Sequence, residues 1–230
     1  MLATAFDPHY SHSSSVLIYA AGVSNSTCTD PCEYERERTR LSDALNNYVS
    51  TDAFVYFGTC SVSDPNVKDS IYVQHKLAME ALVSRHPRYI IARLPQVAGK
   101  TANPHTLLNF LYSHITNNKR FTLYRNATRN VIDVNDIVMI VQSLLRDRRA
   151  RKITRNIANS ASCAISQLVS IMEGVLSKSA LVDAVDQGSH YDIDTSLIMP
   201  ILTDLNIDFN NNYIERIIHK YYGKNQPQRP

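Results

Sequence analysis

The stretch that decides the fold runs from Phe54 to Glu80 and reads FVYFGTCS, a short polar connection, and then IYVQHKLAME from Ile71 onward. Its first part is an apolar run rich in β-forming residues. The run ends in small polar side chains, as a buried parallel strand does at its carboxyl end. The second part places its aromatic and apolar residues at helical spacing. We therefore expect a buried strand followed by a helix.

Tyr72 and Lys76 lie four residues apart, so they share one face of this predicted helix. A free phenol has a pKa of about 10, and a cation within about 4–6 Å lowers it. We expect Lys76 to lower the pKa of Tyr72, so that the phenol exchanges a proton with a sugar or alcohol hydroxyl. A strand-end hydroxyl, from Thr59 or Ser61, would hold the same substrate oxygen. A Tyr and a Lys at this spacing also occur on ordinary amphipathic helices. The pattern indicates a functional site only because a strand that ends in Thr, Cys and Ser precedes it.

Two further apolar runs resemble the first one. Residues 16–21 read VLIYAA and end at Gly22, and residues 89–94 read YIIARL and end at Pro95. Helical patterns separate all three runs, and parallel strands need such crossover connections. We expect residues 16–21, 53–57 and 89–94 to form adjacent parallel strands.

The other elements follow from caps and periodicity. Asp30 and Pro31 begin a helix well, since Asp caps a helix and Pro fits its first position. The charged run 35–40 in this helix is expected to be a solvated face with pairs four residues apart. Further helices are expected at 1–10, 103–117, 137–145, 164–176, 198–205 and 213–222, short strands at 121–124 and 152–158, and a disordered tail at 226–230.

Composition sets broad bounds on the function. The chain has 230 residues, 44% of them hydrophobic and 20% charged, with a net charge of +3. These values are ordinary for a globular domain and predict no nucleic-acid partner. The four cysteines match no zinc pattern and no disulfide framework, so no metal site is expected. The sequence has no long apolar run and no signal peptide, which predicts a cytoplasmic protein with no membrane contact.

Four stretches together resemble the extended short-chain dehydrogenase/reductase family, the NAD-dependent epimerase/dehydratase group that acts on nucleotide sugars. They are Gly58-Thr-Cys-Ser-Val62, Tyr72-x-x-x-Lys76, the strand and turn 89–99, and Arg129-Asn-Val-Ile-Asp-Val-Asn-Asp136. Their order and spacing match over roughly residues 16–145. Each motif alone is common, and the combination is specific.

The resemblance implies a role for each of several residues. It makes Thr59, Tyr72 and Lys76 the catalytic set, and it assigns cofactor contacts to Ala20, Ala21, Gly22, Tyr72, Lys76 and Val97. It assigns substrate contacts to Ser61, Gln96 and Arg129, the last of these suited to a diphosphate. Dehydratases of the family carry an acidic pair where this chain has Cys60 and Ser61. That difference argues for epimerisation or ketone reduction rather than 4,6-dehydration.

One motif of the family has no counterpart here. A dinucleotide-binding fold opens with a strand and a Gly-x-Gly-x-x-Gly turn that holds the pyrophosphate, and Gly22 is the first glycine of this chain. Two explanations stay open: the sequence starts downstream of the true start, or the protein is a natural reduced member. Either way we expect NAD or NADP to bind weakly, with a Kd nearer millimolar than micromolar, a loss of about 4 kcal/mol.

The sequence thus predicts an α/β protein with a Rossmann-like parallel sheet, reduced at its N-terminal half, and a small, mostly helical substrate lobe. The core would span residues 1–100, with the lobe at 101–225 interleaved with it. The predicted function is an NAD(P)-dependent nucleotide-sugar epimerase or ketoreductase, and the resemblance also allows a homodimer. The alternative is a non-catalytic binding module of the same fold that has lost the dinucleotide turn.

Overall fold

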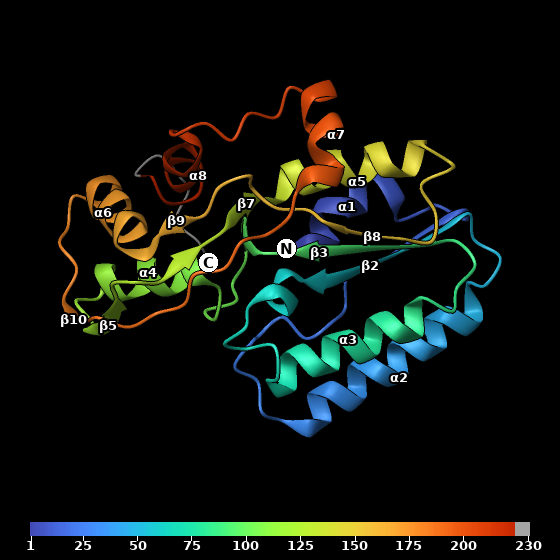
Figure 1. The fold of residues 1–230 in the computed structure, drawn as a ribbon, viewed down its shortest axis with the longest axis horizontal. Coiled ribbons are helices and arrows are strands. Elements are labelled where there is room, and N and C mark those ends of the chain that lie inside the picture. The colour runs from blue at the N-terminus through green and yellow to red at the C-terminus, as the bar shows by residue number, and fades with distance from the viewer. Residues whose placement is uncertain (224–230) are drawn as a thin grey trace.

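A computed structural model gives the arrangement of the chain and describes residues 1–223. At its centre lies a four-stranded sheet in the order β1-β2-β3-β8 (Figure 1). The strands are β1 (Val16–Tyr19), β2 (Ala53–Thr59), β3 (Tyr89–Leu94) and β8 (Ile153–Asn156), and every neighbouring pair is parallel. The prediction of three adjacent parallel strands is therefore confirmed.

Helices cover both faces of this sheet. Figure 1 shows α2 (Pro31–Asn47) and α3 (Ile71–Val83) on one face and α1 (Leu2–Tyr10) and α5 (Val134–Arg146) on the other. Because successive side chains of a strand point to opposite faces, β2 contributes to two hydrophobic cores. Phe54 and Tyr56 pack with residues of α2 and α3, whereas Val55 and Phe57 pack with residues of α1 and α5.

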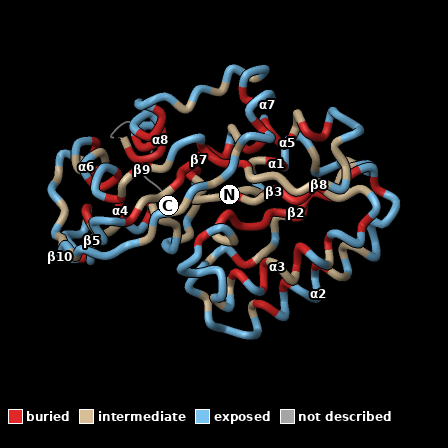
Figure 2. Tube along the Cα trace, in the orientation of Figure 1, coloured by how far each residue is buried: buried red, intermediate tan, exposed pale blue. Residues whose placement is uncertain are grey.

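This two-sided packing explains the unbroken apolar run in β2. All seven residues of the strand are buried, and Figure 2 shows β2 and β3 as buried segments between more exposed helices. The face that carries α5 also packs against the 3-10 turn η2 (Ser196–Ile198) and α7 (Met199–Asp204) through Ile198 and Leu202. A strand covered on both faces needs no alternation of polar and apolar residues.

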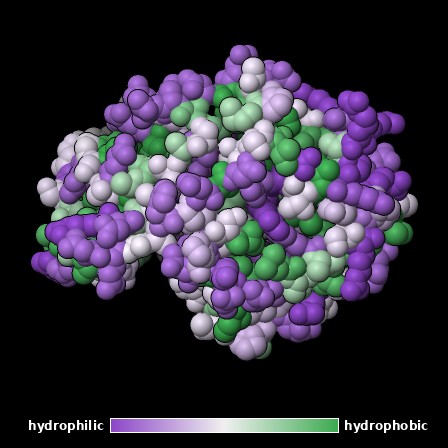
Figure 3. All heavy atoms as spheres, in the orientation of Figure 1, coloured by the Kyte–Doolittle hydropathy of each residue, from purple (hydrophilic) through white to green (hydrophobic). Residues whose placement is uncertain are grey.

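A second body of structure extends from one end of the sheet and has its own hydrophobic core (Figure 1). Its helices are α4 (Leu107–Thr116), α6 (Ile165–Leu176) and α8 (Tyr213–Tyr222), and its strands are β5 (Phe121–Tyr124) and β10 (Val182–Val185), which pair in parallel. Figure 3 shows a notch in the outline between this lobe and the body that carries α2 and α3. Short pairs join the lobe to the sheet, namely β4 (Gln96–Ala98) with β7 (Val131–Asp133) and β6 (Thr128–Arg129) with β9 (Cys163–Ala164).

Polar contacts fix α8 against the start of α5. The Tyr213 hydroxyl donates to Oδ2 of Asp136 at 2.5 Å and accepts from the backbone N–H of Asp133 at 2.9 Å. The Asp133 carboxylate caps α5 and also accepts hydrogen bonds from Lys220 and Tyr221. These contacts tie the lobe to the segment that leads back into the sheet.

Several predicted boundaries were wrong. The helix expected from residue 103 begins at Leu107, because the Asn103 side chain accepts from the His105 N–H and forms a turn instead. The helix expected at 198–205 is split between η2 and α7. Strand β1 ends at Tyr19 rather than at residue 21, and β2 continues through Gly58 to Thr59. The expected tail at 226–230 lies outside the described residues.

Within residues 1–223 no helix is both long and apolar enough to cross a membrane.

Candidate active site

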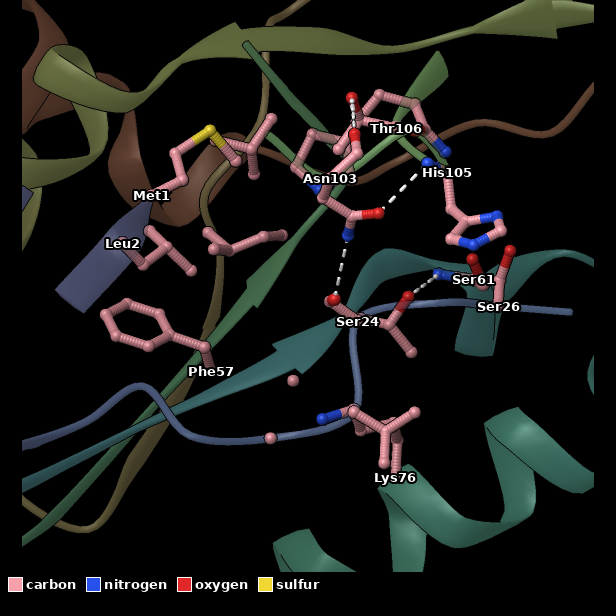
Figure 4. A pocket seen from close by; sticks show the side chains of 18 of the residues that line it. Met1, Leu2, Ser24, Ser26, Phe57, Ser61, Lys76, Asn103, His105 and Thr106 are labelled. Atoms are coloured by element: carbon pink, nitrogen blue, oxygen red, sulfur yellow. Dashed lines mark hydrogen bonds between the residues drawn. The ribbon is translucent and has the colours of Figure 1, made fainter. Parts of the chain in front are cut away.

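A cavity of about 310 Å³ opens beyond the carboxyl ends of β1, β2 and β3 (Figure 4). Side chains from the chain after β1, from the end of β2 and from α3 line it, together with residues of the lobe. Open α/β sheets bind their ligands at this edge, and the volume lies at the small end of the range for ligand pockets, about 300–1,000 Å³. The topology therefore points to this cavity as the candidate active site.

Thr59 and Tyr72 meet inside the cavity. Thr59 is the last residue of β2, and its hydroxyl accepts a hydrogen bond from the Ser61 N–H at 3.1 Å, which caps the short 3-10 turn η1 (Cys60–Ser63). The Tyr72 phenol lines the same cavity, close enough to Thr59 for this hydroxyl to lower the pKa of the phenol. Tyr72 stands in the first turn of α3, whose cap is Ser70. Two hydroxyl groups from separate elements thus lie beside each other in the cavity.

The expectation that Lys76 lowers the pKa of Tyr72 was wrong for this structure. Burial raises the pKa of the Tyr72 phenol to about 12, the hydrogen bond with Thr59 opposes this, and the negative charge of Glu37 adds to it. Lys76 stands one turn further along α3 and lines the cavity. Its ammonium, however, is held by another partner.

That partner is Glu37, which lies on α2. Nζ of Lys76 is 3.0 Å from Oε1 of Glu37 and 3.3 Å from the Tyr56 hydroxyl, and the side chains of Lys76 and Glu37 are 4% and 1% exposed. A Cβ added at Gly22 would lie 2.6 Å from both Nζ and Oε1. Glycine at this position therefore lets the chain after β1 pass directly over the ion pair.

Donors from four residues hold the Glu37 carboxylate. Oε2 accepts from the Val23 N–H at 2.7 Å and from Nε2 of His75 at 3.0 Å, and Oε1 accepts from the Tyr56 hydroxyl at 2.8 Å as well as from Lys76. Burial alone would raise the pKa of Glu37, but His75, Lys76 and the other donors together lower it to about 2. The carboxylate is therefore ionised at neutral pH.

Glu37 corrects the interpretation of residues 35–40 as a solvated face. Its neighbours do face solvent, with Glu33 paired to Arg36 and Glu35 to Arg38 at three-residue rather than four-residue spacing. Glu37 points inward because it falls three residues after Tyr34 and four before Leu41, both of which are buried. That helical spacing was the available signal, and the surrounding charges obscured it.

Other residues predicted for the site line the same cavity. They are Ala20, Gly22, Ser61, Gln96, Val97 and Arg129. Ala21 is the exception, since it is exposed and is not among the lining residues. The Arg129 side chain donates to the Thr128 carbonyl at 2.7 Å, which fixes one end of its guanidinium near the cavity.

Asn103, His105 and Tyr191 are among the lining residues that the sequence did not assign to the site. Asn103 reaches across to donate to Oγ of Ser24 at 3.3 Å, and His105 stands beside it (Figure 4). Tyr191 lies near Ser61, and burial raises the pKa of its phenol. All three come from segments without regular structure, so no periodic signal marks them.

Cys60 is buried and takes no part in the cavity lining. Its thiol donates to the Arg93 carbonyl at 3.3 Å, and burial raises its pKa to about 12. A thiol in this state is a poor nucleophile. Over the described part of the chain no group of three or more His, Cys, Asp or Glu side chains is placed to hold a metal ion.

Comparisons with known proteins show similarity at the level of the fold and not of the sequence. No protein-family model matches the sequence, and no curated protein does. The fold is similar to that of a dTDP-glucose 4,6-dehydratase from Bacillus anthracis solved with NAD, with a TM-score of 0.68 at 17% identity over 92% of this chain and 73% of that one. A UDP-N-acetylglucosamine 4-epimerase from Methanobrevibacter ruminantium, solved with UDP-N-acetylmuramic acid, also has a TM-score of 0.68, at 18% identity over 88% of this chain and 74% of that one.

This chain has the fold of the extended short-chain dehydrogenases/reductases. A UDP-glucuronic acid 4-epimerase from Bacillus cereus, solved with NAD, agrees with this, with a TM-score of 0.67 at 19% identity over 88% of this chain and 76% of that one. The expected α/β fold with its parallel sheet is therefore confirmed. At such identities the likeness concerns the fold.

Proposed function

We propose that this protein is an NAD(P)-dependent enzyme that epimerises or reduces nucleotide sugars, with Thr59, Tyr72 and Lys76 as its catalytic set. The observation that carries the proposal is that Thr59, Tyr72 and Lys76 line one cavity at the carboxyl ends of the parallel strands. The similarity in fold to nucleotide-sugar epimerases and dehydratases supports the same class of reaction.

The hydroxyl groups of Thr59 and Tyr72 have different roles towards one substrate oxygen. Thr59 donates a hydrogen bond that orients this oxygen, and Tyr72 exchanges a proton with it. In reduction, the carbonyl carbon gains a hydride and its oxygen takes the Tyr72 proton, which solvent then replaces. In epimerisation, Tyr72 would have to be ionised at the start, so that its phenolate takes the proton of the substrate hydroxyl and later returns it to the same oxygen. NAD(P), when bound, supplies or accepts that hydride.

The donor groups present suit the nicotinamide-ribose half of the cofactor. Lys76 supplies an ammonium at the cavity wall, and Ala20 and Gly22 form a floor with little side-chain bulk. The ammonium can donate a hydrogen bond to a ribose hydroxyl, and the small floor residues leave room for the flat nicotinamide ring. Val97, on β4, adds an apolar side chain to the lining.

The substrate end of the proposed site is polar and cationic. Gln96 and Arg129 line it, and a guanidinium suits a diphosphate because its donors match phosphate oxygens in pairs. No aspartate or glutamate is among the described residues that line the cavity. Dehydration needs an acid and a base next to the sugar, so this lining favours epimerisation or ketone reduction.

A turnover experiment tests the proposal. The protein would be incubated with NAD⁺, NADH, NADP⁺ or NADPH and a panel of UDP- and dTDP-linked sugars and 4-keto sugars, with products identified by NMR. Calorimetric titration of each cofactor would run alongside, and weak binding, with a Kd nearer millimolar than micromolar, is the expected result. An epimer or an alcohol formed by the native chain and not by Tyr72→Phe supports the proposal.

The second candidate function is a non-catalytic module that binds a nucleotide sugar. One observation favours it, namely that Lys76, the residue proposed to hold the cofactor ribose, is already paired with Glu37. Such a module would bind a UDP- or dTDP-sugar in calorimetry, would show no heat with any nicotinamide cofactor, and would form no product. That combination of results would replace the enzymatic proposal.

A further inference from the structure

We propose that Glu37 is a positioning residue that offsets the charge of Lys76 and thereby keeps Tyr72 protonated, as a proton donor. The part of this inference that concerns a reaction rests on the function proposed above. The part that concerns the protonation of Tyr72 stands on the ligand-free protein alone.

The geometry leaves Glu37 no freedom to move away from Lys76. Its carboxylate is 1% exposed and accepts hydrogen bonds from donors on three elements, which are the Val23 N–H after β1, the Tyr56 hydroxyl on β2, and His75 and Lys76 on α3. The pair is therefore part of the framework of the site. Because the pair is removed from water, its charges are poorly screened.

The donors of Lys76 are largely committed as well. An ammonium has three N–H groups, and Nζ lies 3.0 Å from Oε1 and 3.4 Å from Oε2 of Glu37 and 3.3 Å from the Tyr56 hydroxyl. All three N–H groups therefore have an acceptor within the protein, although the side chain also lines the cavity. Two of the three acceptors belong to Glu37, so this carboxylate both fixes the ammonium and offsets the electrostatic field that Lys76 would exert on Tyr72.

The groups that face Tyr72 come from three elements. They are Thr59 and Tyr56 on β2, Tyr34 and Glu37 on α2, and, on α3 itself, Lys76 and also His75, which bonds Glu37 and packs on the Tyr34 ring. The ammonium of Lys76 is paired with the Glu37 carboxylate at 3.0 Å, so no unpaired lysine charge stands beside the phenol. With no net cation beside it, the phenol responds mainly to burial, which favours its neutral form.

A protonated phenol serves one direction of the proposed chemistry. It can give its proton to a carbonyl oxygen while the carbonyl carbon gains a hydride, but it cannot take a proton from a substrate hydroxyl. Removal of a hydroxyl proton requires the phenolate, which this arrangement disfavours. Glu37 therefore points to ketone reduction in preference to steps that begin by oxidising an alcohol.

The test is a site-resolved titration of Tyr72 in the ligand-free chain. Tyrosine would be replaced throughout by a fluorinated tyrosine of lower pKa, so that ¹⁹F NMR follows ionisation within the pH range where the protein is folded. The Tyr72 signal would be identified by its loss in Tyr72→Phe. In Glu37→Gln the Tyr72 pKa should fall, by about 1 unit or more if the charge acts at close range. The exposed neighbour Glu35→Gln should leave it unchanged.

A second comparison covers the case in which Glu37→Gln does not fold. Lys76→Gln and the double variant Glu37→Gln/Lys76→Gln both lack the buried ammonium, and they differ only in the carboxylate. Tyr72 should titrate at a higher pH in Lys76→Gln than in the double variant. Equal Tyr72 titrations within either pair of folded proteins would overturn the inference, because a merely structural Glu37 would not move the phenol. The result does not depend on turnover, so failure here and failure of the proposed reaction are separate outcomes.

Discussion

Nζ of Lys76 lies 3.0 Å from Oε1 of Glu37, and the two side chains come from adjacent helices on one face of the sheet. Both are removed from water, so each charge depends on the other. The desolvation of two ions is costly, and the pair is tolerated here because Val23, Tyr56 and His75 supply the remaining hydrogen bonds. Removing one partner should therefore lower the free energy of unfolding more than removing both partners does.

Glu37→Gln should lower the free energy of unfolding by about 3–5 kcal/mol, because it leaves the Lys76 ammonium buried without a counter-charge. The double variant Glu37→Gln/Lys76→Met should recover most of this loss. Urea denaturation of the three proteins would measure it. The matched control is Glu35→Gln, whose side chain is 69% exposed and whose effect should stay within about 0.5 kcal/mol. A Glu37→Gln protein as stable as the native chain would contradict the account of the buried pair.

The same carboxylate should make stability depend on acid pH. Its pKa is about 2 in the folded protein against an ordinary 4.5, so the folded state favours the ionised form. A lowered carboxyl pKa contributes stability that is complete above about pH 4.5 and is lost as the pH falls towards 2. The contribution is about 3 kcal/mol.

Denaturation midpoints of the native chain and of Glu37→Gln, measured from pH 7 to pH 2, would show this. The stability difference between the two proteins should shrink as the pH falls. A difference that stayed constant over that range would mean that Glu37 is not the titrating group.

The fold could be predicted from the sequence wherever a segment is long and uniformly apolar. β2 and β3 are buried on both faces, so their runs carry no polar interruption and are readily recognised. β4, β6, β7 and β9 have only two or three residues each, and their partners lie more than thirty positions away, as with Gln96 and Val131. No local period can mark such strands, because tertiary contacts alone create them.

The candidate site divides in a similar way. Thr59, Tyr72 and Lys76 line one cavity, as their places at a strand end and on one helix face predict. The charge environment was not predictable from spacing, because Glu37 belongs to another helix in a run of charged residues. Its contact with Lys76 depends on the packing of α2 against α3, which the two helix patterns do not fix.

Tyr213 links the lobe to the sheet, and its hydroxyl should matter for stability. In Tyr213→Phe the Asp133 N–H and the Asp136 carboxylate both lose their hydrogen bond to this group. Leaving such buried groups unsatisfied costs about 1–3 kcal/mol. The pKa of Asp136, which burial already raises and Tyr213 helps to restrain, should rise further.

Thermal and urea denaturation would measure the first effect, and a carboxyl titration by NMR the second. Tyr124→Phe is the control, because Tyr124 is 45% exposed. If Tyr213→Phe unfolded like Tyr124→Phe and the native chain, the contact between α8 and the start of α5 would contribute nothing measurable to stability.

Tyr72→Phe provides the most direct test of the proposed chemistry. The phenol proton is needed only in the chemical step, so its loss should lower kcat by about 10²–10⁴-fold without a matching rise in KM. Substrate and cofactor binding, measured by calorimetry, should stay within a few-fold, since the ring that fills the cavity wall is unchanged.

Two further variants separate the proton from its surroundings. Thr59→Val removes the hydroxyl that lines the cavity with Tyr72 but leaves the phenol proton, so it should lower kcat by less than Tyr72→Phe does. Tyr48→Phe, which changes a tyrosine that is 44% exposed, should behave like the native chain. A Tyr72→Phe protein with native kcat would remove Tyr72 from the mechanism, and the hydroxyl of Thr59 would then have to act on the substrate without it.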